Sequence, residues 1–350
     1  MRYLRLLPFA LAAGAILMLE ACIALAGNGG QYNTDFFDFS PLKQDVLQRH
    51  VIYSKFMIEF ADVPSDAVLI GDSSGFYGVQ SDQVTAADPG LSFLNLGCCG
   101  DVGWTGFIYQ SELALKQAAQ RPKFLVLHVT PFWGPNAKKF AGDNVLAVTI
   151  RDYLLRVMWW HKVVIPSNGY RLRILNLVND GIWLDDFAYD SFAWPTLGYP
   201  PLRTWRQEMR DGRGWVPMPV DLKDSMVQRP EPEACVFDND YSKPSELGFG
   251  RVDLLYDYLK RLADLTERAG VRFVLVTNPV PCVVQPNDPV VADALRQLAR
   301  FKADYPKAIV PFDFFRQADL HRFIDRWHLN VDGGAWHSRE IGAALREAGG

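Results

Sequence analysis

Five short runs rich in β-forming residues recur along the chain, and most are separated by stretches with the periodicity of amphipathic helices. The runs are DAVLI (66–70), LSFLN (91–95), KFLVLHV (123–129), VRFVLVT (271–277) and AIVPF (308–312). Helical periodicity is clearest over residues 104–120 and 251–268. Strands that alternate with helices pair in parallel, with helices on both faces of the sheet. We therefore expect an α/β fold, a three-layer sandwich around a central parallel sheet.

The alternation is interrupted between residues 136 and 250, which hold few strand signals and many tryptophans. We interpret this segment as an insertion in one core that comprises residues 61–135 and 251–350, preceded by an aromatic entry segment at residues 28–60. The tryptophans either pack the insertion onto the sheet or form a surface that stacks sugars or lies near a membrane. Packing is favoured because Trp side chains are mostly buried.

The first residues, 1–27, have the composition of a signal peptide or a membrane anchor. Two arginines precede an apolar stretch, residues 6–26, whose only charge is Glu20. Three fates compete: cleavage after Ala24-Leu25-Ala26, lipid attachment at Cys22, or retention as a single span. Retention is favoured because the stretch is long enough to cross a bilayer core of about 30 Å. In each case the body of the protein is expected outside the cytoplasm.

The cysteines and the charge narrow the possible partners. Apart from the leader, the chain has Cys98, Cys99, Cys235 and Cys282. Neighbouring cysteines rarely pair with each other, so Cys98 or Cys99 is a candidate for a disulfide to Cys235 or Cys282; buried free thiols are the alternative. No spacing indicates a metal site, and we expect no cofactor. A net charge of −4 without a long Lys/Arg run argues against nucleic-acid binding.

One turn carries a candidate nucleophile. The sequence VLIGDSSGFYG, residues 68–78, leads from the first core strand into a Gly-Asp-Ser turn. Because ligands bind at the carboxyl ends of parallel strands, we expect Ser73 at the ligand-binding edge of the sheet. A serine nucleophile needs a base within hydrogen-bond distance and an acid that orients the base.

The segment IDRWHLNVDGG, residues 324–334, supplies a candidate base and acid. Asp325 and His328 are three residues apart, which places both side chains on one face of a helical turn. The carboxylate then accepts a hydrogen bond from one ring nitrogen while the other nitrogen faces a serine. The other five histidines lie in contexts that favour structural roles: His50, His128, His161, His321 and His337.

The order of these residues separates three families that share a GDSSG-like serine. Trypsin-like proteases place the serine after the histidine and the aspartate, and α/β-hydrolases place it after several strands with a remote acid. Here Ser73 follows the first core strand, and Asp325 stands three residues before His328. This arrangement resembles the GDSL/SGNH hydrolase-like superfamily, whose first block is GDS and whose last is DxxH. The resemblance covers residues 64–135 and 251–348.

The second block of that superfamily is matched by FLNLGCCGDVGWTGF, residues 93–107. The resemblance implies an oxyanion hole formed by the backbone amides of Ser73 and Gly100. The third block departs from the family pattern, because LVLHVTPFWGPN stands where GxND is expected. Thr130, or Asn278 in VTNPVP, is the candidate for a third oxyanion donor.

These features predict ester chemistry through an acyl-serine intermediate, and the resemblance implies that it takes place at the bacterial cell envelope. The N-terminal segment and the altered third block resemble the SGNH-like proteins that act beside polysaccharide O-acetylation and teichoic-acid modification systems. The resemblance implies an envelope polysaccharide as the acyl acceptor, a multispanning membrane O-acyltransferase as a partner, and a periplasmic body anchored to the inner membrane. A secreted carbohydrate or lipid esterase is one alternative, and a non-catalytic scaffold or binding subunit of an envelope assembly is the other.

Overall fold

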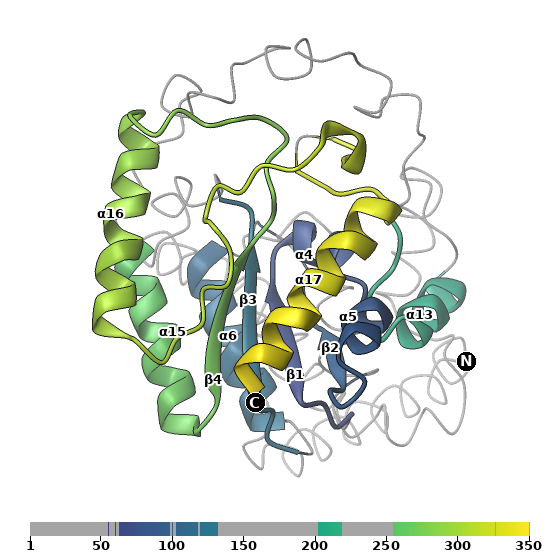
Figure 1. Ribbon diagram of the computed structural model, residues 1–350. Coiled ribbons are helices and arrows are strands. Elements are labelled where there is room, and N and C mark those ends of the chain that lie inside the picture. Colours follow the sequence, from purple (N-terminus) through teal and green to yellow (C-terminus); the bar gives the residue numbers. More distant parts are fainter. Residues whose placement is uncertain are drawn as a thin grey trace, which may run out of the picture.

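The computed structural model of the 350-residue chain describes residues 55, 60, 63–98, 100, 103–117, 120–131, 202–218, 255–325 and 327–349. These residues form an α/β unit with a sheet of four parallel strands (Figure 1). The expected N-terminal signal or anchor lies outside the described residues, as do most of the entry segment and most of the insertion. No helix in the described part of the chain is long and apolar enough to cross a membrane.

The four strands are β1 (Ala67–Gly71), β2 (Phe93–Asn95), β3 (Phe124–Val129) and β4 (Arg272–Thr277). They lie in the order β2-β1-β3-β4, and each adjacent pair is parallel. The chain therefore passes from β1 to β2 on one side and later to β3 on the other. The strand order reverses between β1 and β3, which is the position where open α/β sheets bind ligands.

Four of the five expected β-rich runs are strands, and the fifth pairs at one residue only. Ile309 forms a parallel bridge with Val274 beside β4. Its amide donates to the Phe273 carbonyl over 2.9 Å, and its carbonyl accepts from the Leu275 amide over 2.8 Å. The next amide that would extend this ladder belongs to Pro311, which has no N–H to donate. The prediction of a strand over residues 308–312 is therefore wrong beyond this bridge.

The helices follow the strands in the order that the alternation predicts. They are α4 (Ser73–Gly78), α5 (Ser81–Ala87), α6 (Gly103–Gln117), α13 (Leu202–Asp211), α15 (Leu255–Ala269), α16 (Pro289–Asp304) and α17 (Val331–Gly349), with a 3₁₀ turn η9 (Leu320–Arg322). The helices expected over residues 104–120 and 251–268 correspond to α6 and α15.

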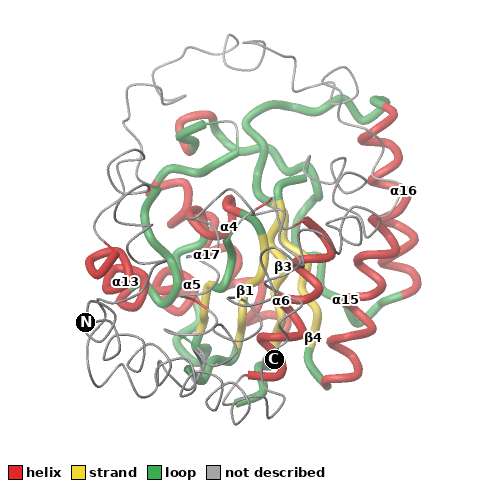
Figure 2. The backbone as a smooth tube through the Cα atoms, turned by 180° about the vertical axis from the view of Figure 1, so that it is seen from behind, coloured by secondary structure: helices red, strands yellow, loops and turns green. Residues whose placement is uncertain are grey.

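Each face of the sheet is covered by its own helices, because successive strand side chains point to opposite faces. On β1, Val68 and Ile70 join a core cluster with residues of α6, α15 and α16. Ala67 and Leu69 join a second cluster with residues of α5 and α17. Figure 1 shows α17 crossing one face of the sheet, and Figure 2 shows α6 and α15 on the other.

Part of the insertion, residues 202–218, packs directly against the β2 edge. Trp205 and Met209 of α13 are fully buried in the larger core cluster. Beyond α13, the Arg213 carbonyl accepts from the Asn95 amide over 3.0 Å, and its side chain donates to the Phe93 carbonyl over 2.8 Å. For Trp205, the packing interpretation of the tryptophan-rich insertion is therefore confirmed.

Candidate active site

A tight turn at the end of β1 places Ser73 at the carboxyl edge of the sheet. Gly71 has a φ of +154°, and a Cβ at this position would lie 1.8 Å from the His128 carbonyl oxygen. Only glycine fits so close to the neighbouring strand. Asp72 then caps α4, because its carboxylate accepts from the Ser74 amide over 3.0 Å. Ser73 is thus the first residue of α4, beside the point where the strand order reverses.

The structure brings the serine, histidine and aspartate singled out in the sequence together. The Ser73 Oγ lies 2.9 Å from the His328 Nε2. The His328 Nδ1 lies 2.8 Å from the Asp325 Oδ2 and 3.0 Å from the Oδ1. Because the carboxylate can only accept, Nδ1 carries the proton and Nε2 is left to accept from the serine. This is the tautomer that a general base for Ser73 requires.

Asp325 and Trp327 are bends and His328 has no regular secondary structure, so the expected helical turn is wrong. The Asp325 Oδ1 accepts from the Trp327 and His328 amides, each over 2.7 Å, and this side-chain cap replaces the helical hydrogen bonds. Burial raises the pKa of Asp325, but the hydrogen bonds from the His328 ring and the two amides outweigh it, and the pKa is lowered overall. The acid is therefore held as a carboxylate.

Asn278 holds this loop from the end of β4. Its side-chain amide donates to the Trp327 carbonyl over 2.9 Å and to the Pro279 carbonyl over 3.0 Å. Both amide hydrogens are thereby used, so Asn278 is not a free donor for an oxyanion. Its position instead fixes the backbone on which His328 stands.

The other candidate oxyanion donors differ in what they have available. The Thr130 amide donates to the Asp72 Oδ2 over 2.7 Å, which leaves only its hydroxyl for an oxyanion. The Ser73 amide makes no hydrogen bond to the described residues. Gly100 lies partly buried in the loop after β2, between residues outside the described part of the chain, and its role stays a prediction.

The loop that leads to Gly100 is fixed by buried polar groups that sequence analysis missed. The Asn95 side chain donates to the Gly75 carbonyl over 2.9 Å and accepts from the Gly97 amide over 2.9 Å. Below it, the Lys55 Nζ donates to the Asn95 carbonyl over 3.0 Å and to the Gly97 carbonyl over 2.6 Å. Lys55 is fully buried, and burial holds its pKa well below the usual range. No local pattern in the sequence marks this lysine.

Two histidines with expected structural roles, His128 and His337, form a buried pair behind the serine turn. Their Nε2 atoms are 3.1 Å apart, and the His128 Nδ1 lies 3.3 Å from the Ser74 Oγ. Burial lowers the pKa of His128 to about 4 and the pKa of His337 well below its usual range. One signal was present in the sequence: His128 is a lone polar residue in the otherwise apolar β3.

Cys98 and Cys282 are buried and disulfide-bonded. The alternative of buried free thiols is therefore wrong for these two residues. The Cys98 amide donates to the Gly71 carbonyl over 2.9 Å, so this cysteine lies directly beside the serine turn.

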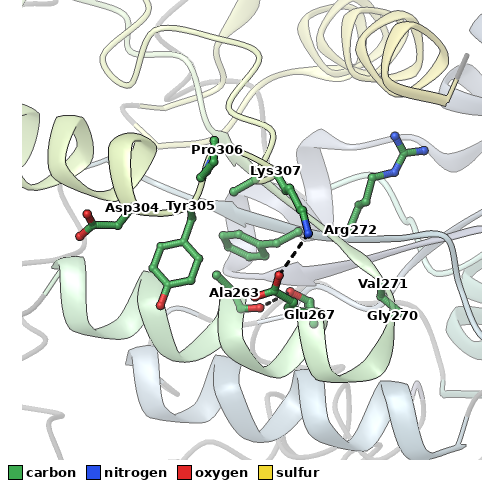
Figure 3. Close-up of a pocket in the computed structure, with 12 residues that line it drawn as sticks. Ala263, Glu267, Gly270, Val271, Arg272, Asp304, Tyr305, Pro306 and Lys307 are labelled. Carbon is green, nitrogen blue, oxygen red and sulfur yellow. Dashed lines mark hydrogen bonds and ion pairs between the residues drawn. The ribbon is translucent and has the colours of Figure 1, made fainter.

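A cavity of about 330 Å³ between α15 and β4 is distinct from this site (Figure 3). It is lined by Gly270 and Val271 at the amino end of β4, with Glu267 and Lys307 forming an ion pair of 3.5 Å. Ser73 lies at the opposite, carboxyl end of the strands, so this cavity is not part of the candidate active site.

Within the described ranges, no group of three or more His, Cys, Asp or Glu side chains is arranged to hold a metal ion. Comparison of the whole chain with protein-family models, curated proteins and solved structures gives no match. The functional argument therefore depends on the geometry of Ser73, His328 and Asp325.

Proposed function

We propose that the protein performs serine-dependent ester chemistry, with Ser73 as the nucleophile, His328 as the general base and Asp325 as the orienting acid. The single observation that carries this proposal is the continuous contact from the Ser73 Oγ through the His328 ring to the Asp325 carboxylate. Ser73 and His328 are 255 residues apart in the sequence, yet with Asp325 they meet in the tautomer and order that nucleophilic catalysis requires. This intact geometry favours an enzyme over a non-catalytic scaffold.

In the first half-reaction the Ser73 oxygen attacks the acyl carbonyl while the His328 Nε2 takes its proton. Asp325 stabilises the imidazolium that forms. The oxyanion is stabilised by the Ser73 amide and, in this proposal, by the Gly100 amide. When the intermediate collapses, the bond to the leaving oxygen breaks, that oxygen takes the proton from His328, and an acyl-Ser73 ester remains.

In the second half-reaction a hydroxyl group of the acceptor attacks the acyl-Ser73 carbonyl and gives its proton to His328. Collapse then returns this proton to the Ser73 oxygen and leaves the acyl group on the acceptor. A sugar hydroxyl as acceptor gives O-acyl transfer, and water gives ester hydrolysis. We propose transfer to an extracytoplasmic polysaccharide, because residues 1–27 have the composition of a signal or membrane anchor and the insertion is rich in tryptophan.

The fold supports an SGNH-like assignment within the doubly wound α/β class. With the Ile309 bridge beside β4, the strand order corresponds to 2-1-3-4-5, the order of flavodoxin-like sheets. The disulfide-bonded Cys98 and Cys282 support an extracytoplasmic, oxidising location. The proposal places the body in the periplasm, anchored by the N-terminal segment, with a multispanning membrane O-acyltransferase supplying the acyl group.

The test is hydrolysis of a chromogenic acetate ester by the full-length chain in detergent, with a soluble glycan as competing acceptor. We expect Ser73→Ala and His328→Ala to lower kcat by at least about a thousandfold. His321→Ala is the matched control, because His321 is exposed on η9. Acetate on the glycan selects transfer, and release of acetate alone selects the esterase. A parent protein no faster than Ser73→Ala, and unreactive with a fluorophosphonate, would refute the proposal.

A further inference from the structure

A hydrogen-bond network that is buried from His337 onward runs from α17 to the turn that carries Ser73. Its members, in order, are Glu340, Arg316, His337, His128, Ser74 and Asp72. His337, His128, Ser74 and Asp72 are buried, and Arg316 is mostly buried between the rings of Phe312 and Trp336. This hydrogen-bond network ends at Ser74 and Asp72, the residues on either side of Ser73.

The chemistry of its two ends fixes the direction of every hydrogen bond in this network. A guanidinium only donates, so the His337 Nδ1, 2.8 Å from Arg316, must accept. The neutral His337 ring then carries its proton on Nε2 and donates to the His128 Nε2 over 3.1 Å. His128 consequently carries its proton on Nδ1 and donates to the Ser74 hydroxyl, which donates to the Asp72 carboxylate. The two rings are therefore opposite tautomers.

Both rings are held neutral, which this arrangement requires. Burial and the nearby Arg316 charge lower the pKa of each imidazole, while the Asp72 carboxylate acts in the opposite direction on His128. The charged groups that face the pair are Arg316 from the loop before η9, Glu340 from α17 beyond it, and Asp72 from the turn after β1. The network thus connects the mostly buried Arg316 cation to the buried Asp72 carboxylate through two neutral rings and one hydroxyl.

The carboxylate at the end of the network fixes the serine turn. Asp72 accepts from the Ser74 amide over 3.0 Å and from the Thr130 amide over 2.7 Å, which joins the first turn of α4 to the end of β3. Any rotation of this carboxylate would move the backbone of Ser73 relative to His328. Its orientation depends in turn on the donor that Ser74 presents.

We propose that Arg316 is a positioning residue which, through His337, His128 and Ser74, orients the Asp72 carboxylate and so aims the Ser73 hydroxyl at His328. The kinetic part of this inference rests on the proposed function. The tautomers and the backbone position of Ser73 do not, and they are measured separately.

The first experiment is ¹⁵N NMR of the full-length chain, with a histidine-labelled sample for the ring nitrogens, assigned by single His→Gln variants, and a uniformly labelled sample for the backbone amides. In the parent we expect only the Nδ1–H tautomer for His128 and only the Nε2–H tautomer for His337. In Arg316→Met we expect each ring to show a mixture of the two tautomers. The amide resonances of Ser73 and Thr130 should shift in Arg316→Met and stay in place in Arg339→Met, a surface change on α17. The Nε2–H tautomer for His128, or an unmoved Ser73 amide, would overturn the inference whether or not the protein is an enzyme.

The second experiment compares fluorophosphonate labelling of Ser73 and acetate-ester kinetics in Arg316→Met, Arg316→Lys and Arg339→Met. A serine displaced by a fraction of an ångström to 1 Å predicts a fall in kcat of about 10- to 100-fold in Arg316→Met with KM unchanged. Arg316→Lys keeps the charge and a donor and should recover most of the rate. Thermal unfolding of each variant confirms that it is folded at the assay temperature. Equal losses of kcat in Arg316→Met and Arg316→Lys would show that Arg316 acts through packing and would refute the positioning role. An unreactive parent protein would refute the proposed function alone, because the NMR experiment tests the network independently.

Discussion

Acid should destabilise this fold through the buried histidine pair well before its carboxylates are protonated. Burial lowers the pKa of His128 to about 4, whereas a histidine in the unfolded chain titrates near 6.5. Between these two values the unfolded state binds a proton that the folded state does not. The free energy of unfolding therefore falls as the pH falls from about 6.5 to about 4. His337 acts in the same direction, because its pKa is also lowered.

The size of this effect follows from the two pKa values. Between the folded-state and unfolded-state pKa values of one histidine, each pH unit of acidification lowers the free energy of unfolding by about 1.4 kcal/mol. Acidification from pH 6.5 to pH 4 should thus remove about 3 kcal/mol through His128 alone. This is a large part of the roughly 5 to 15 kcal/mol that stabilises a typical domain. Asp325 adds to the acid destabilisation only at lower pH, because the stability that its lowered pKa provides is present above about pH 4 and is lost as the pH falls further.

The assay is equilibrium denaturation by urea at half-unit pH steps from 7.5 to 4, for the parent, His128→Gln and the exposed control His321→Gln. The parent and the control should lose stability with the same slope below about pH 6.5. His128→Gln should start from a lower stability and show a shallower slope, because one of the two buried rings is gone. A parent curve that is flat between pH 6.5 and 4.5, or an unchanged slope in His128→Gln, would refute the assignment of neutral buried imidazoles.

Three further changes test the geometry around the serine. Gly71→Ala should prevent folding, because the new Cβ would lie 1.8 Å from a β3 carbonyl oxygen. Gly90→Ala is the control, because its new Cβ would lie 3.6 Å from the nearest neighbouring atom. Equal melting temperatures for the two variants would contradict the close approach at Gly71. Asn278→Ala should slow fluorophosphonate labelling about tenfold, since it frees the loop that carries His328; a rate equal to that of the parent would show that the loop is held by other contacts. Reduction with dithiothreitol should slow the same labelling, because Cys98 is disulfide-bonded and its amide contacts the serine turn, and unchanged labelling would show that the disulfide does not stiffen this turn.

Sequence patterns predicted the parts of the fold that depend on neighbouring residues. The apolar runs at 66–70, 123–129 and 271–277 are strands because side chains of alternate residues bury on opposite faces of a sheet. The Gly-Asp-Ser turn is likewise local, since the glycine permits the close approach and the aspartate caps the helix. Ser73 could therefore be placed at the edge of the sheet from its position in the sequence.

The pairing of Ser73 with His328 and Asp325 was predicted from residue order, but its local geometry was not. A three-residue spacing is compatible with a helical turn or with a side-chain-capped loop, and the choice depends on what holds the backbone. Here the Asp325 carboxylate caps two amides and Asn278 fixes the Trp327 carbonyl, so the loop is the stable form. A contact from the residue that follows β4, distant in the sequence, decided this point.

The sequence by itself determined an α/β sheet, a serine at its carboxyl edge and a histidine with its acid near the end of the chain. Only the tertiary structure decided that His128 and His337, 209 residues apart, meet under that serine, and that Lys55 is buried below the loop after β2. Periodicity and turn chemistry are properties of adjacent residues and can be read from their order. A buried hydrogen-bond network instead depends on packing, which brings distant polar groups together and makes each one the partner that the others need once water is excluded.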